Sequence, residues 1–137
     1  MSMTQNLLYA AVQVAHNFGA VSAVGGSAAG WALKDTARRR KLAWLTSAGW
    51  LTQALSGAAF GAVSYAYYHR FPDLGEIPIG ALVIKMTCVA AALLLFAYYI
   101  LRARRRSGET RATFVWPVSL VLAATALTAA AVLRWFS

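Results

Sequence analysis

The segment 34-KDTARRRK-41 holds five basic residues and lies between two long apolar runs. A second basic segment, 102-RARRRSGETR-111, lies between two further apolar runs. Each run is long enough to cross a hydrocarbon core about 30 Å thick, because an α-helix rises about 1.5 Å per residue. We therefore predict an all-α fold, a bundle of four transmembrane helices. Its spans cover about residues 7–33, 42–68, 77–101 and 113–136.

The composition also favours the bilayer as the solvent of this chain. Of the 137 residues, 60% are hydrophobic and 12% are charged. In soluble domains about a quarter of the residues are charged. Four spans with short loops use the whole length, so residues 1–137 are expected to form a single integral membrane domain. The net charge of +9 does not indicate nucleic acid as a partner, because ten of the thirteen basic residues lie in the two short basic segments.

The distribution of charge predicts the orientation of the spans. The middle connection, 69-HRFPDLGE-76, holds one Arg and two acidic residues. By the positive-inside rule the two basic segments are cytoplasmic, which places both termini outside. In a bacterium this is the inner membrane, with the termini in the periplasm. Aromatic residues are expected to mark the two interfaces: Trp31, Trp44, Tyr98, Tyr99 and Trp116 on the cytoplasmic side, and Tyr65, Tyr67, Tyr68 and Trp135 on the outer side.

Small residues recur at four-residue spacing in the first two spans. They are Ser22, Gly26 and Gly30 in the first, and Gly57 and Gly61 in the second. This spacing lets helix backbones approach closely, either within the bundle or against another subunit.

Two ionisable residues, His16 and Lys85, lie well inside the predicted spans. Ionisable groups are costly in hydrocarbon, which makes them candidates for function. Measured from the middle of its own span, each lies roughly 6 to 8 Å toward the outer side, so the two are predicted to share a layer. Gln53 of the second span and Thr128 of the fourth are expected near this layer, where they could close a small polar pocket. Gln13, His16 and Asn17 form a polar stripe that is expected to point into the bundle or at a partner.

Several roles are open for the two ionisable residues. Lys85 could extend toward the acidic residues of segment 69–76, lose its proton, or meet an anionic group such as a haem propionate or a lipid phosphate. His16 could be a neutral histidine hydrogen-bonded across helices, or a ligand of haem iron or another metal. His69 is predicted roughly 15 Å farther out than His16, so the pair cannot hold one haem between them. A second ligand would come from another chain or from a residue such as Met86, and haem b and copper are the cofactors considered.

Two short segments resemble the CopD-like (copper resistance D) membrane proteins. In 15-AHNFGAVSAVGG-26 a first-helix histidine precedes a small-residue stretch that ends in Gly-Gly, and in 80-GALVIKM-86 a lysine follows a glycine early in a helix. The resemblance covers two of the four predicted spans. It implies an inner-membrane bundle linked to copper handling or to haem and electron transfer, with His16 and Lys85 as the residues that carry over.

Nothing in the sequence indicates an enzyme of the soluble type, because it has no acidic pair, no nucleophile beside a base and no phosphate-binding loop. The expected function is that of a small non-catalytic subunit in a larger redox or energy-converting membrane complex. Its cofactor-binding residues would be His16 and Lys85, with His16 as the metal ligand, in the outer half of the bilayer. The alternatives are a copper-handling or other small-solute transporter, and a quinone-reactive subunit in which His16 is the one candidate proton acceptor.

Overall fold

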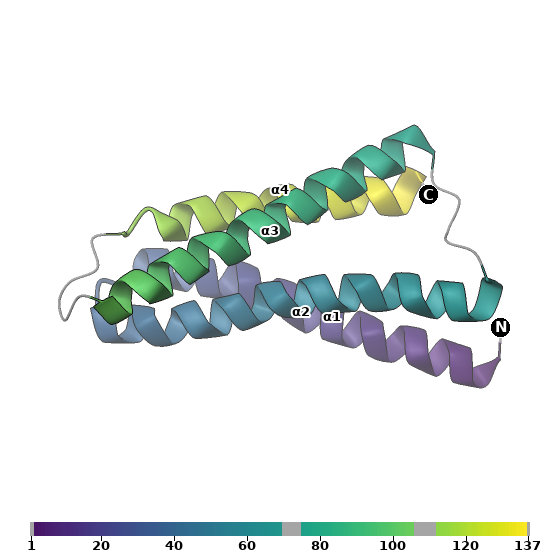
Figure 1. Cartoon of the computed structure of the whole chain (residues 1–137), viewed down its shortest axis with the longest axis horizontal. Helices are drawn as coiled ribbons and strands as arrows, with labels where there is room; N and C mark the ends of the chain where they lie inside the picture. The colour runs from purple at the N-terminus through teal and green to yellow at the C-terminus, as the bar shows by residue number, and fades with distance from the viewer. Residues whose placement is uncertain (1, 70–74, 106–111, 137) are drawn as a thin grey trace.

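The computed structural model describes residues 2–69, 75–105 and 112–136, and their fold is all-helical. The helices coincide closely with the predicted apolar runs (Figure 1). They are α1 (Met3–Ala32), α2 (Thr36–Tyr68), α3 (Glu76–Arg105) and α4 (Val115–Phe136).

Three of these helices, α1, α3 and α4, are long and apolar enough to cross a membrane. Helix α2 has 33 residues but is less apolar along its length. Part of the reason is a set of polar side chains, including Thr46, Gln53 and Ser56, that are buried inside the bundle. The low hydropathy of α2 thus comes partly from side chains that do not face the surroundings of the molecule.

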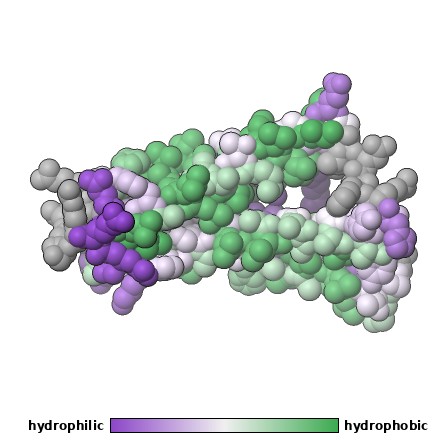
Figure 2. Space-filling view, viewed as in Figure 1, coloured by the Kyte–Doolittle hydropathy of each residue, from purple (hydrophilic) through white to green (hydrophobic). Residues whose placement is uncertain are grey.

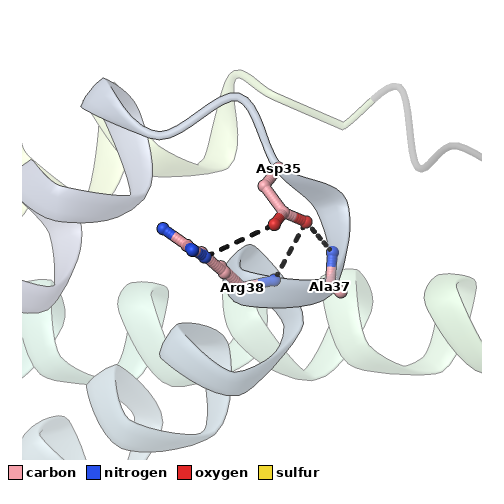
Figure 3. Close-up of polar contacts among 3 residues, drawn as sticks. All are labelled: Asp35, Ala37 and Arg38. Carbon is pink, nitrogen blue, oxygen red and sulfur yellow. Dashed lines mark hydrogen bonds and ion pairs between the residues drawn. The ribbon is translucent and has the colours of Figure 1, made fainter.

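The first basic segment is not the loop that the sequence predicts. Helix α2 begins at Thr36, and Asp35 caps it. Figure 3 shows the Asp35 carboxylate accepting hydrogen bonds from the backbone N–H groups of Ala37 at 2.8 Å and Arg38 at 3.4 Å, and pairing with the Arg38 guanidinium at 3.4 Å. A capped start satisfies backbone donors that would otherwise lack partners. Most of segment 34–41 therefore forms the first turns of a helix.

The helices form a ring in which each packs on two neighbours. Helix α1 packs against α2 and α4, and α3 also packs against α2 and α4. Figure 1 shows the α1–α2 pair and the α3–α4 pair close together at one end and farther apart at the other. We call the close end, where Asp35 lies, the basic end, and the end with both chain termini the terminal end. The two termini lie at the same end of the bundle.

Large aromatic side chains fill the core toward the basic end. Trp116 and Tyr99 are 0% and 2% exposed, and the rings of Phe96 and Tyr99 meet the Trp116 ring edge to face at 5.4 and 5.5 Å between centroids. The prediction that Trp116 and Tyr99 mark a membrane interface is therefore wrong, because both point into the bundle. The other predicted interface aromatics are exposed: Trp31, Trp44, Tyr98, Tyr65, Tyr67, Tyr68 and Trp135.

Glycines of α1 make the close packing possible. A Cβ atom on Gly26 would lie 2.1 Å from Thr46 Oγ1, and one on Gly30 would lie 2.0 Å from the Trp116 ring. These contacts confirm the close approach predicted for the small residues of α1. A Cβ on Gly57, in contrast, would meet no atom within 4 Å, so Gly57 makes no close helix contact among the described residues, and its packing against another subunit stays a prediction.

Candidate cofactor site between the helix pairs

His16 and Lys85 meet in the bundle, as their predicted shared depth allows. The Lys85 Nζ atom lies 3.1 Å from His16 Nε2. Helices α1 and α3 are diagonal in the ring, so this hydrogen bond crosses the middle of the bundle. Both side chains are partly buried. The structure thus confirms the shared layer, and it joins the α1–α2 pair to the α3–α4 pair through two ionisable groups.

The other ring nitrogen of His16 is held by α2. Ser56 Oγ lies 2.7 Å from His16 Nδ1, and the same hydroxyl donates to the backbone carbonyl of Thr52 at 2.5 Å. A serine hydroxyl has one proton to donate, so it accepts from His16 Nδ1–H. The Nε2 lone pair is then free to accept from the Lys85 ammonium. The hydrogen bonds therefore assign a neutral imidazole with its acceptor nitrogen directed at Lys85.

Gln53 belongs to the same network, and Thr128 does not. The Gln53 side-chain amide is buried and donates to the backbone carbonyl of His16, which fixes α1 against α2 beside the imidazole. Thr128 is exposed on α4 and donates to its own helix, at the carbonyl of Ala124, 2.9 Å away. The polar pocket expected from these residues therefore contains Gln53 but not Thr128.

Lys85 has no carboxylate partner within the described residues, where Arg38 and Asp35 form an ion pair. Its ammonium reaches toward His16, on the far side of the bundle, and not toward Glu76 at the start of its own helix. Asp73, the other acid considered for Lys85, lies outside the described residues. A cation inside hydrocarbon is costly without a hydrogen-bonding or charged partner. This arrangement leaves two of the three ammonium protons for a further acceptor.

The Phe60 ring lies next to His16, on the side facing the terminal end, and the Tyr9 ring lies against Phe60. The Phe60 ring meets the imidazole edge to face at 5.9 Å, and Tyr9 stacks on Phe60 at 6.3 Å between centroids. The Tyr9 hydroxyl is hydrogen-bonded to Ser64 Oγ at 2.9 Å. Ser56, Phe60 and Tyr9 are not among the site residues predicted from the sequence. Gln53, Ser56 and Phe60 have the i, i+3, i+7 spacing of one helix face, which was the available signal.

The surface of the bundle is hollowed between two of its helices. Figure 2 shows an opening between α2 and α3 toward the terminal end, with hydrophobic residues above and below it and hydrophilic atoms visible in its depth.

His16 is not part of a larger cluster of metal-ligating side chains. The described residues contain no group of three or more His, Cys, Asp or Glu side chains placed to hold a metal ion. His69 caps the far end of α2, more than three turns beyond Ser56, so roughly 20 Å of helix separates it from the His16 layer. Met86 is exposed, and Cys88 is buried in the core. His16 would supply one ligand, and the prediction of haem or copper at His16 stays a prediction.

A second polar pair lies on the outside of α1. Gln13 and Asn17 are exposed, and the Gln13 amide donates to Asn17 Oδ1 at 2.8 Å. The predicted polar stripe is therefore split: His16 faces the bundle, and Gln13 and Asn17 face away from it. Carboxamides have more donors and acceptors than this one bond uses.

No family model matches the chain, and no curated protein or solved structure matches it. The resemblance to CopD-like proteins thus stays a prediction. The features of the structure that bear on function are the His16–Lys85 network and the polar surface of α1.

Proposed function

We propose that this chain is a four-span, non-catalytic subunit of a larger redox or energy-converting complex in the bacterial inner membrane, with both termini outside. Helix α2 would be the fourth span. At 33 residues it is about 50 Å long, which exceeds the hydrocarbon thickness. Its polar residues Thr46, Gln53 and Ser56 are covered by neighbouring helices, and an even number of spans agrees with two termini at one end of the bundle.

The observation that carries the subunit proposal is the exposed Gln13–Asn17 pair. In the proposed topology this pair lies within the span of α1, where no water satisfies the remaining amide donors and acceptors. Asn and Gln side chains at this depth typically hydrogen-bond across helices. A transmembrane helix from another protein would supply these partners and cover the exposed side of α1.

The His16–Lys85 network supports the redox part of the proposal. Histidines that bind metals usually donate their other ring N–H to a fixed acceptor, and Ser56 holds His16 Nδ1 in this way. His16 Nε2 would then present one ligand to a haem or metal that is shared with a partner. Lys85 would move from Nε2 to an anionic group of the same cofactor, such as a propionate.

The proposal is tested by purifying the tagged chain from its native membrane in mild detergent. Other membrane proteins should copurify, and Asn17→Leu should reduce their yield, because leucine removes the amide but not the bulk. Thr87→Val is the matched control, since Thr87 is exposed on α3 and bonds to its own backbone at 2.8 Å. A lone chain with no copurifying protein would contradict the subunit proposal. A Soret band or bound copper that disappears with His16→Ala would assign the cofactor.

A further inference from the structure

We propose that the His16–Lys85 network binds the ring of a membrane-soluble quinone, which enters between α2 and α3. This inference rests on the proposed function as a redox subunit and names the ligand class of the same site. The network has three features that such a ligand needs: a charged hydrogen-bond donor, a nearby aromatic surface and an opening toward the bilayer.

The donor is the Lys85 ammonium. His16 Nε2 accepts one of its protons at 3.1 Å, and no carboxylate of the described residues accepts another. A quinone carbonyl is a neutral acceptor that can reach this depth, because the molecule is soluble in hydrocarbon. Hydrogen bonds from charged donors are stronger than neutral ones, particularly where water is excluded. The carbonyl would occupy a free ammonium donor while His16 stays bound to Ser56.

The aromatic surface is formed by Phe60 and Tyr9. Both are partly buried, and the Phe60 ring contacts the imidazole at 5.9 Å between centroids. A planar ring bound at Lys85 would therefore lie within reach of Phe60, and aromatic pairs of this kind favour offset or edge-on stacking. A small inorganic anion would gain nothing from these rings. This contrast is why the geometry favours a planar ring ligand over a simple anion.

The opening lets a ligand reach the His16–Lys85 network from the bilayer without passing through water. Figure 2 shows the surface hollowed between α2 and α3 in the terminal half. Lys85 lies in the first third of α3, which begins at the terminal end. Water-soluble ligands would have to cross the outer interface to reach this depth. A quinone already dissolved in the bilayer would enter sideways and leave its isoprenoid tail in the lipid.

The test measures binding of a decyl-tailed benzoquinone to the purified full chain in nanodiscs, with empty nanodiscs as the partition blank. Saturable binding is expected. Lys85→Met should weaken it about ten- to a hundredfold, the loss of one charged hydrogen bond. Phe60→Leu should weaken it several-fold through the lost ring contact. Thr87→Val and Lys41→Met, which alter an exposed hydroxyl and a distant charge, should leave it unchanged. A thermal unfolding curve for each variant shows whether it is folded. If Lys85→Met does not fold, His16→Gln is used in its place.

Non-saturable uptake, or equal affinity in Lys85→Met and the controls, would overturn the quinone assignment. A purified protein that already holds haem or copper at His16, and binds no added quinone, would overturn it too. Whichever of these results is found, the copurification of other membrane proteins is measured separately. The subunit proposal can therefore survive when the quinone inference fails, and each can be refuted alone.

Discussion

The neighbouring glycines Gly25 and Gly26 offer a sharp test of the packing between α1 and α2. An alanine Cβ at Gly26 would lie 2.1 Å from Thr46 Oγ1, whereas one at Gly25 would meet no atom within 4 Å. Ordinary contact begins at 3.4 Å, so Thr46 must retreat by about 1.3 Å in Gly26→Ala. Thr46 is fully buried, which leaves little room for that movement.

The change in stability expected for each alanine variant follows from two opposing effects. Alanine is favoured over glycine inside a helix by about 0.5–1 kcal/mol, and this gain is common to both variants. Overpacking a close contact costs about 1–3 kcal/mol, and only Gly26→Ala incurs it. Gly25→Ala should therefore stabilise the protein slightly. Gly26→Ala should be less stable than Gly25→Ala by about 1–3 kcal/mol.

Cys88 provides the assay, because it is the one cysteine of the chain and it is buried. A fluorogenic thiol reagent reports its exposure during thermal unfolding in detergent. Gly26→Ala should expose Cys88 at a lower temperature than wild type, and Gly25→Ala at the same or a higher temperature. Equal unfolding temperatures for the two alanine variants would refute the close α1–α2 contact described here.

Three further substitutions test other contacts by the same thermal assay. Ser119→Ala should destabilise the protein by about 1–3 kcal/mol, because Ser119 Oγ accepts from the buried Trp50 indole N–H at 3.2 Å. Thr46→Val should be neutral or stabilising, since the buried Thr46 hydroxyl has no hydrogen-bond partner among the described residues; a loss as large as that of Ser119→Ala would contradict this. Asp35→Ala should cost about 0.5–2 kcal/mol by removing the cap of α2, and Asp35→Asn should restore most of it; equal effects of Ala and Asn would argue against capping.

The sequence predicted well how far each residue lies along its span, and poorly which way its side chain points. The shared layer of His16 and Lys85 was predictable because helix rise fixes how far a residue lies along its span. Trp116 was misplaced because hydropathy does not say whether an aromatic side chain points to lipid or to the core. The rotation of each helix about its axis decides that, and it depends on contacts such as Gly30 against Trp116 that involve residues far apart in the chain.

The same limit explains the residues that were missed around the site. Ser56 and Phe60 share a face with Gln53, but a serine and a phenylalanine in a span are ordinary packing residues until a partner helix is placed against them. The start of α2 was missed for a different reason. A run of basic residues has the composition of a loop, and the Asp35 cap that continues the helix through it is a single residue.

The central claim is that the chain spans the membrane four times, and the orientation of the two termini tests it most directly. A four-span bundle has both termini on one side of the membrane, whereas a three-span bundle has them on opposite sides. Single cysteines at Ser2 and Ser137, each in a Cys88→Ser background, are labelled in intact cells with an impermeant thiol reagent. A cysteine in segment 34–41 serves as the cytoplasmic control. We expect labelling at both termini and protection of the control. Labelling at one terminus alone would show that α2 does not span, and protection of both termini with labelling of segment 34–41 would invert the proposed topology.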